Sequence, residues 1–440
     1  MAQIPKNPTT IDPADNNAAQ PDHPYQPYMD TKPPPNAGLS DANGMPLTER
    51  EIESLEKQAR AERETTPEPK DFNIAFPDNL PTPPFLHVDG VPNFRDLGGY
   101  QCLPPTTVVT GGGDASSDTA TATAGAAGAA TADGKTYVLK RNLLYRCAHP
   151  THLTPQGLTY LTTTLNVHDM YDLRSAPEIS RLAATVSSSG KAVYPLADPH
   201  TGCLLDSLPG LTRHFVPVYQ TEDYGPVALA RKLQWYTAEQ SFDPAHDFAY
   251  SEGFVRAYRD IAMHGAGAYR VMFRHLLRQP QPPQPLVFHC TAGKDRTGVF
   301  GALVMKLVGV DEETICWEYA LTEPGLGAWR KEFIERISQT GLGGGGGKAP
   351  AQNGDVSRPA ISRDEAARIC GSRAGNMRAF LRTVLDGEFG GIHAYLTDRC
   401  GLTAEEVQRL RDALIEEVPT QEVLGRVEIE GWTAEGGCVD

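Results

Sequence analysis

Apolar positions along this chain follow the period of strands in some segments and the period of helices in others. Val167–Leu173 alternates between apolar and polar residues, and Pro285–Phe288 is a short apolar run, so both segments predict strands. Ser251 to about Leu277 has the helical period and predicts two helices, broken near Gly265 to Gly267. Val299–Val308 is apolar on nearly every side and predicts a buried helix.

Capping residues and a helical stripe predict three more helices. Thr154 can cap a helix that has Pro155 at its first position. Met377–Leu385 carries a helical stripe, and Thr403 forms a capping box with Glu406 at the start of a last helix. Because strands and helices are interspersed, we expect an α/β fold with a central, mostly parallel sheet that is flanked by helices.

Composition divides the chain into regions. Residues 1–83 are rich in Pro, Asp, Asn and Thr and poor in large apolar side chains, which predicts a disordered N-terminal arm. Residues 84–425 are predicted to form one domain, and residues 426–440 a C-terminal tail. Two low-complexity insertions interrupt the domain, one of Thr, Ala, Gly and Ser at about 105–134 and a glycine-rich one at 341–358.

The overall charge and the cysteines limit the classes of partner and the compartment. The formal net charge of −15 does not attract nucleic acid or an anionic membrane by bulk electrostatics, so neither is an expected partner. No apolar run reaches the roughly 18 residues that span a bilayer, so we expect no membrane insertion. The eight cysteines are scattered and include no CxxC pair. This spacing disfavours a zinc ribbon or a disulfide scaffold and favours a cytoplasmic protein, with the nucleus as an alternative.

Ten consecutive residues, His289 to Gly298, carry the strongest chemical signal. They follow the predicted strand at 285–288 and precede the buried helix at 299–308, so they form a loop that ends at a helix N-terminus. Cys290 and Arg296 lie six positions apart in this loop, and no other cysteine of the chain has an arginine at that spacing. A strand, a tight loop and a helix are the parts of a phosphate cradle, here with a thiol at its floor and an arginine at its rim.

This cradle contains the groups that the hydrolysis of a phosphate monoester requires. Without a metal, the reaction requires an anionic nucleophile, cationic clamping of the phosphoryl oxygens and a proton for the leaving oxygen. Cys290 can be the nucleophile, because amide N–H groups and a helix N-terminus favour a thiolate. Arg296 can bind phosphate with two donors, and Thr297 can hydrogen-bond the sulfur as it leaves. His289 can orient the loop. No metal or cofactor is required. The phosphate-binding residues of the loop are predicted to be Thr291, Ala292, Gly293 and Lys294.

The loop resembles the signature of the cysteine-dependent tyrosine phosphatase superfamily. Its Lys-Asp-Arg version is similar to a branch, found in bacteria and fungi, that is described as tyrosine or tyrosine/serine phosphatases. Four further segments resemble motifs of that branch: Asn93–Gly99, Leu144–Cys147, Asp172–Ser175 with Glu178, and Glu318–Glu323. The resemblance spans about residues 85–425 and implies a tyrosine-phosphatase-like fold. It also implies hydrolysis through a phosphocysteine intermediate. Cys147 stands where the branch usually has serine, and we interpret it as a small core residue rather than a second redox-active thiol.

The proton donor has two candidates. The resemblance implies Asp295, inside the loop, and we favour it; its alternative role is to hold Arg296 in an ion pair. Glu222 and Asp223 lie in the stretch where a mobile acid loop would be expected, and they are the second candidate. A further set of charged residues is predicted to brace the site through ion pairs: Arg95, Asp96, Asp172 and Arg174.

The expected substrate is a phosphorylated protein, and the expected activity is that of a protein tyrosine phosphatase, with dual specificity left open. Lys294 beside Arg296 would place two cations at the rim of the loop. Inositol-lipid phosphatases of the superfamily also carry basic residues there, so a phosphoinositide or inositol phosphatase is the alternative. A non-catalytic phosphate-binding module is a lesser alternative, which the presence of both Cys290 and Arg296 disfavours.

Overall fold

A computed structural model describes residue 77 and residues 79–105, 135–179, 207–220, 240–244, 247–278, 283–340 and 361–438. All of them lie within the unit Asp71–Asp440. Nearly all of the predicted disordered arm, most of the insertion predicted at about 105–134 and all of the one predicted at 341–358 lie outside the described residues.

A six-stranded sheet in the order β1-β3-β9-β4-β6-β5 forms the centre of the fold. Its four inner strands run parallel, while the short edge strands β1 and β5 run antiparallel to their neighbours. The predicted α/β fold with a mostly parallel sheet is therefore confirmed. The strands of the sheet are β1 (Arg95–Asp96), β3 (Leu144–Cys147), β4 (Asp169–Asp172), β5 (Ser207–Leu208), β6 (Leu211–Phe215) and β9 (Leu286–His289). Smaller antiparallel pairs in the described residues are β2 (Lys135–Leu139) with β10 (Ile415–Pro419), β7 (Gln240–Asp243) with β8 (Phe248–Ser251), and β11 (Trp432–Thr433) with β12 (Gly437–Cys438).

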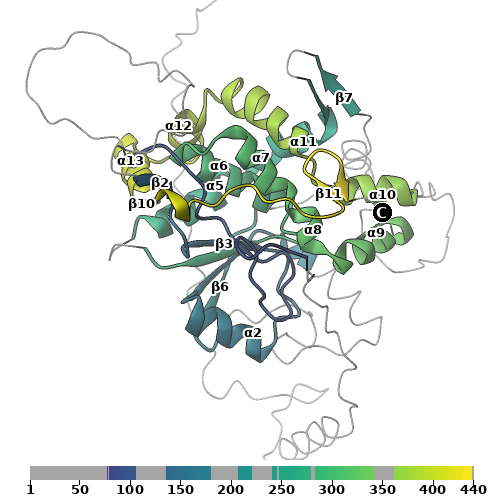
Figure 1. Cartoon of the computed structure of the whole chain (residues 1–440), viewed down its shortest axis with the longest axis horizontal. Helices are drawn as coiled ribbons and strands as arrows, with labels where there is room; N and C mark the ends of the chain where they lie inside the picture. The colour runs from purple at the N-terminus through teal and green to yellow at the C-terminus, as the bar shows by residue number, and fades with distance from the viewer. Residues whose placement is uncertain are drawn as a thin grey trace, which may run out of the picture. The chain divides into compact units, whose positions relative to one another are not determined.

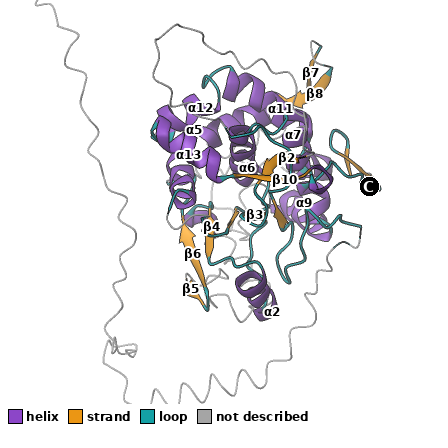
Figure 2. Ribbon diagram, turned by 60° about the vertical axis from the view of Figure 1, so that its left-hand side comes forward, coloured by secondary structure: helices purple, strands orange, loops and turns teal. Residues whose placement is uncertain are grey.

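Helices cover both faces of this sheet (Figures 1 and 2). On one face, α2 and its π-helical continuation η1 pack on a core that includes Val287 of β9. On the other face, α5 and α6 pack on a larger core that includes Leu286 and Phe288 of the same strand. Successive residues of a strand point to opposite faces, so β9 contributes to both cores. The helices are α2 (Pro155–Thr159), η1 (Tyr160–Thr164), α5 (Glu252–Leu276), α6 (Asp295–Val308), α7 (Glu312–Ala320), α8 (Thr322–Leu326), α9 (Ala328–Thr340), α10 (Arg363–Cys370), α11 (Ala374–Ala379), η2 (Phe380–Asp386), α12 (Ile392–Ala394), η3 (Tyr395–Arg399), α13 (Ala404–Ala413) and the short 3-10 turn η4 (Thr420–Glu422).

The predicted helices form where their local signals place them. Thr154 accepts a hydrogen bond from Gly157 N at 3.1 Å, and Thr403 and Glu406 form the predicted capping box. The segment 377–385 lies in α11 and η2, and the apolar segment after the loop lies in α6, which is buried on nearly all sides. These predictions are confirmed. Each of them rests on contacts within one helical turn or on hydrophobicity alone, and such local signals need no information about the rest of the fold.

The predicted break in the long helix is wrong, because α5 runs without interruption from Glu252 to Leu276. Glycine inside a helix costs about 1 kcal/mol relative to alanine, and that cost predicted the break. Packing of α5 in the core offsets this cost at Gly265. Gly265 is buried, and a Cβ at this position would lie 2.9 Å from the ring of Tyr269. The glycine therefore allows a close contact in the core that a larger residue would prevent.

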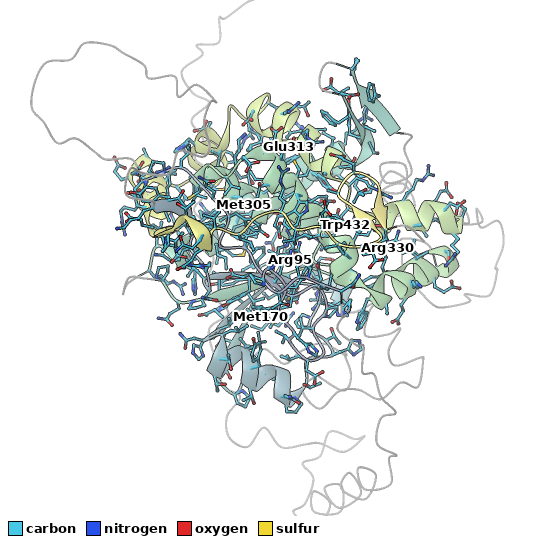
Figure 3. All side chains as sticks on the ribbon, in the orientation of Figure 1. Arg95, Met170, Met305, Glu313, Arg330 and Trp432 are labelled. Atoms are coloured by element: carbon cyan, nitrogen blue, oxygen red, sulfur yellow. The ribbon has the colours of Figure 1, made fainter. Side chains whose placement is uncertain are left out.

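The C-terminal residues pack on the domain. Ile429 and Trp432 are buried in the main core, and β11 pairs with β12 to form a ribbon within the stretch predicted as a tail. Figure 3 labels Trp432 on this ribbon. Among the described helices, none combines the length and the hydrophobicity that crossing a bilayer requires.

Candidate active site

The loop from Cys290 to Lys294 begins at the carboxyl end of β9, between the parallel neighbours β3 and β4. Carboxyl ends of parallel strands meet at one edge of a sheet, so residues that follow β3, β4 and β9 gather there. The loop turns sharply at Gly293, whose φ is +65°. A Cβ at this position would lie 2.2 Å from the carbonyl oxygen of Cys147, so only glycine fits where the loop crosses β3.

Neighbouring segments hold the two residues that follow Cys290 through one backbone and one side-chain donor. The Cys290 side chain is 3% exposed. Thr291 O accepts a hydrogen bond from His149 N at 3.0 Å, and Ala292 O accepts one from Asn93 Nδ2 at 3.2 Å. Both carbonyls are therefore held by groups from outside the loop. The N-terminus of α6 follows directly and adds the positive end of a helix dipole to the loop.

Arg296 forms a bidentate ion pair with Glu178. The Arg296 Nη1 to Glu178 Oε2 distance is 2.6 Å and the Nη2 to Oε1 distance is 2.8 Å. Thr291 Oγ1 also donates to Glu178, so this carboxylate joins the loop to the first turn of α6. Burial raises the pKa of Glu178, but the Arg296 guanidinium and these hydrogen bonds outweigh burial and lower it to about 2. Glu178 is therefore ionised at neutral pH and orients Arg296. It was noted in a resembling motif, but no role was predicted for it.

Asp172 and His289 lie behind the loop at the ends of β4 and β9. Asp172 accepts hydrogen bonds from Arg174 Nε at 2.9 Å and from Arg213 Nη2 at 2.9 Å. Burial raises the pKa of Asp172, and the two guanidinium groups reverse this and hold it well below its usual range. Burial lowers the pKa of His289 to about 4, so its ring is neutral at pH 7. His289 Nδ1 lies 3.1 Å from Cys290 O, and since a carbonyl only accepts, Nδ1 carries the proton.

A buried ion triad supports the loop from below. Glu318 Oε1 lies 2.6 Å from Arg95 Nε, and Glu318 Oε2 lies 2.6 Å from Arg146 Nη1. Arg146 Nη2 also donates to Gly293 O at 2.7 Å, which connects the triad to the loop. Arg95 is labelled at the middle of the fold in Figure 3. Sequence reasoning included Arg95 in the site but gave no role to Arg146 or Glu318, although both lie in resembling motifs.

Replacing Glu318 with Gln is expected to lower the free energy of unfolding by roughly 3–5 kcal/mol, because it leaves two buried guanidinium groups without their carboxylate. Chemical denaturation monitored by tryptophan fluorescence measures this change. Glu417→Gln is the matched control, since Glu417 pairs with Lys135 where these side chains are 40% and 53% exposed, and its loss should cost less than about 1 kcal/mol. Equal losses in the two variants would contradict a supporting role for the triad.

Backbone N–H groups beside β1 and β3 hold the carboxylate of Asp96. Its carboxylate accepts hydrogen bonds from Gly98 N at 2.9 Å and from Asn142 N at 2.7 Å. Burial raises the pKa of Asp96 to about 6, against the lowering effect of these two backbone bonds. It orders the turns beside β1 and β3, and the structure gives it no ion pair with Arg95.

Lys294 points away from the rim where it was expected. Its side chain is 4% exposed, and its ammonium donates to Ile369 O at 2.9 Å and to Gly371 O at 3.1 Å. The same ammonium lies 3.0 Å from Asp295 Oδ1. The expected pair of cations at the rim is thus replaced by a buried lysine, because one carbonyl in the last turn of α10 and one just after that helix accept its hydrogen bonds. Asp295 is the first residue of α6.

Of the remaining predicted site residues, the structure describes Thr297 but neither Asp223 nor Glu222. Thr297 is fully buried, and its hydroxyl oxygen has no hydrogen-bond partner among the described residues. Asp223 and Glu222 lie outside the described residues.

Cys147 is buried with Val287 and Tyr145, whereas Cys290 belongs to the core on the other face of the sheet. Burial raises the pKa of the Cys147 thiol, which keeps it protonated. The described residues contain no cluster of three or more His, Cys, Asp or Glu that could hold a metal ion.

The arrangement joins a thiol at the end of a strand, a loop of backbone amides, a helix N-terminus and an oriented guanidinium. Residues 123–416 match the Tyrosine phosphatase family. A tyrosine-protein phosphatase from Nostoc commune is 28% identical over 163 residues, which are 37% of this chain and 49% of that protein. The triple specificity protein phosphatase PtpB from Mycobacterium tuberculosis is 25% identical over 287 residues, which are 63% of this chain and 92% of that protein. The chain thus spans about half the length of the Nostoc relative. The family match covers more than half of the chain and includes the loop with Cys290 and Arg296, so the chain belongs to the tyrosine phosphatase family of hydrolases.

Proposed function

We propose that this protein hydrolyses phosphate monoesters through a phosphocysteine formed at Cys290, and that its substrates are phosphotyrosine proteins. The observation that carries the proposal is the loop itself. Cys290 lies at the end of a buried central strand, and Arg296 lies in the first turn of the following helix with its guanidinium oriented by Glu178. A nucleophile, amide donors and a cation on one short segment are what transfer of a phosphoryl group requires.

The reaction has two steps. Cys290 Sγ attacks phosphorus as a thiolate, the bond to the leaving oxygen breaks, and Asp295 gives that oxygen a proton. A water molecule then attacks the phosphocysteine. Asp295 takes a proton from this water, the phosphorus–sulfur bond breaks, and phosphate and the thiolate are released. Thr297 serves the second step in this proposal, because its hydroxyl is buried without a partner among the described residues and is free to donate to the departing sulfur.

The other predicted site residues bind the phosphate or support the loop. The amides of residues 291–294, together with Arg296, offer donors to the three non-reacting phosphoryl oxygens, as the superfamily resemblance implies. Arg95, Asp172 and Arg174 act by ion pairs that hold the loop and its neighbouring strand ends, and His289 acts by orienting the carbonyl of Cys290. The cysteines of the described residues are all free thiols, which supports a reducing compartment such as the cytoplasm.

Phosphotyrosine is favoured over phosphoserine by the low exposure of the thiol. Cys290 is only 3% exposed, so a phosphate on a longer side chain reaches it more readily. A tyrosine ring carries its phosphate several bonds farther from the backbone than serine does. The name of the Mycobacterium relative, triple specificity, supports testing more than one substrate class. Phosphoinositides are the second class, because an inositol ring also holds its phosphates away from the lipid backbone.

In a panel of phosphotyrosine peptides, phosphoserine peptides and phosphoinositide vesicles, kcat/KM is expected to be at least about tenfold higher for phosphotyrosine than for the others, a difference of about 1.4 kcal/mol. Release of inorganic phosphate measures it. Vanadate should inhibit, since it occupies a phosphate cradle, and a chelator such as EDTA should leave the rate unchanged. Turnover of phosphoinositides far above that of peptides would replace the proposed substrate. Binding without turnover of any member would indicate a phosphate-binding module.

A further inference from the structure

Lys294 occupies a position that differs from that of a phosphate ligand. An ammonium group has three N–H donors. Among the described residues, this ammonium donates to Ile369 O at 2.9 Å and to Gly371 O at 3.1 Å, and it lies 3.0 Å from Asp295 Oδ1 as an ion-pair partner. The ammonium also lies 4.6 Å from the centre of the Phe254 ring, a distance typical of a cation–π contact. Its charge is therefore compensated inside the protein.

The two carbonyls that hold Lys294 lie in the last turn of α10 and just after it, and the residues that follow them are fastened at several points. Ser372 Oγ donates to Ala320 O at 2.9 Å, and Ser372 N donates to Glu323 Oε2 at 3.3 Å. Ala374 N donates to Ala434 O at 2.9 Å, which joins the segment to the C-terminal ribbon. These contacts join Ser372 to the end of α7 and to α8, and the start of α11 to the ribbon. Lys294 thus extends from the phosphate loop to a fixed backbone rather than to solvent.

Glu323 makes this fastening stronger than the Ser372 contacts alone. Its buried carboxylate accepts from Cys438 N at 3.1 Å and lies 3.0 Å from Arg330 Nη2 of α9. Figure 3 labels Arg330 and Trp432, and both lie on the side of the fold that contains α9 and the ribbon. A buried carboxylate with several partners resists movement, so the carbonyls of residues 369 and 371 have little freedom.

We propose that Lys294 is a positioning residue for Asp295, and that it does not bind the substrate phosphate. This inference rests on the proposed function, in which Asp295 delivers the proton. The ammonium lies 3.0 Å from the buried Asp295 Oδ1 and holds it as an ion-pair partner, since no described residue donates a hydrogen bond to that atom. The proton for the leaving oxygen is then carried by Oδ2. Protonation of Oδ2 leaves the partial negative charge of Oδ1 next to the ammonium, so Lys294 still orients the group.

Positioning an acid has a different kinetic consequence from binding a phosphate. A proton donor matters in proportion to the basicity of the leaving oxygen, and it contributes about 10²–10⁴-fold when that oxygen is basic. It contributes little when the leaving group is a stable anion. A lost phosphate ligand, in contrast, weakens binding of every substrate by a similar factor. The dependence of the rate on the leaving group therefore separates the two roles.

Lys294→Met keeps the length of the side chain and removes its charge. With a series of aryl phosphates from nitrophenyl to methoxyphenyl and with a phosphotyrosine peptide, its kcat should fall by about 30- to 100-fold for the most basic leaving groups and by less than about threefold for nitrophenyl phosphate. KM and the vanadate Kd should stay within about twofold of the wild type. Asp295→Asn should give the same pattern, and the double variant should be no slower than Asp295→Asn alone.

Lys306→Met is the matched control. Lys306 lies on α6, the helix that follows Lys294, and pairs with Asp386 at 2.8 Å near the surface. The kinetics of this variant should equal those of the wild type. Ser372→Ala is the second variant, because it loosens the segment that holds Lys294 without changing the loop. Its kcat should show the same dependence on the leaving group, with a smaller loss of about three- to tenfold. This variant still tests the inference if thermal unfolding shows that Lys294→Met folds poorly.

The outcomes separate this inference from the proposed function. Equal losses on all leaving groups in Lys294→Met, or a KM and vanadate Kd raised tenfold, would assign Lys294 to phosphate binding and overturn the inference. If Lys294→Met is unstable, a Ser372→Ala variant whose kcat depends on the leaving group as in the wild type would overturn the inference. If the wild type releases no phosphate, or if Asp295→Asn is fully active on phosphotyrosine, the proposed function or its acid fails instead.

Discussion

Cys290→Ser is expected to lower phosphate release from an aryl phosphate by about 10⁵-fold, to the background of the assay, while phosphorylated ligands still bind. The magnitude follows from other enzymes in which the nucleophile was removed. A serine hydroxyl stays protonated at neutral pH, and the neighbouring His289 is a weak base, because burial lowers its pKa to about 4 and its Nδ1 proton faces Cys290 O. The amides and Arg296 remain, so the cradle is kept. Steady-state kinetics measures the first effect, and calorimetric titration with a phosphotyrosine peptide measures the second.

Cys147→Ser is the matched control for this variant. Cys147 lies on β3, paired with His289 of β9, and its side chain packs in the core on the opposite face from Cys290. Its thiol is buried and stays protonated, so its exchange for a hydroxyl should leave kcat/KM within about threefold of the wild type and cost only stability. Retained activity in Cys290→Ser, or loss of activity in both variants, would refute the assignment of the nucleophile.

Arg296→Lys is expected to lower kcat/KM by about 10³-fold, which corresponds to about 4 kcal/mol of transition-state stabilisation. Lysine keeps the charge but cannot reproduce a planar fork of donors. It would also lose the two-point contact with Glu178, whose oxygens lie 2.6 and 2.8 Å from the two terminal nitrogens of Arg296. Both the clamp on phosphate and the orientation of that clamp would be affected. The vanadate Kd should rise as well, which distinguishes this variant from Cys290→Ser.

Arg256→Lys serves as the control for Arg296→Lys. Arg256 is exposed on α5 and pairs with Glu252 of the same helix at 3.1 Å, so its replacement should change neither kcat/KM nor vanadate binding. A wild-type kcat/KM for Arg296→Lys would show that a point charge suffices at this position and would remove the bidentate clamp from the mechanism.

Much of the fold follows from signals within a few residues. The box of Thr403 and Glu406 and the cap at Thr154 are formed as predicted, because each depends on a hydrogen bond across one helical turn. The buried α6 follows from hydrophobicity alone. The break predicted near Gly265 did not form, since the ring of Tyr269 and the core around it favour a continuous helix. Packing thus overrides local propensity where a helix lies against the sheet.

Within the site, the spacing of Cys290 and Arg296 in the chain located the candidate loop and the family. The sequence by itself determined this because the groups that surround a phosphate lie on ten consecutive residues between a strand and a helix. Only the tertiary structure decided that Glu178 orients Arg296, that Arg146 holds Gly293, and that Lys294 turns inward to carbonyls about 75 residues further along the chain. Such contacts depend on which strand ends meet at one edge of the sheet, and that is a property of the folded topology rather than of any local pattern.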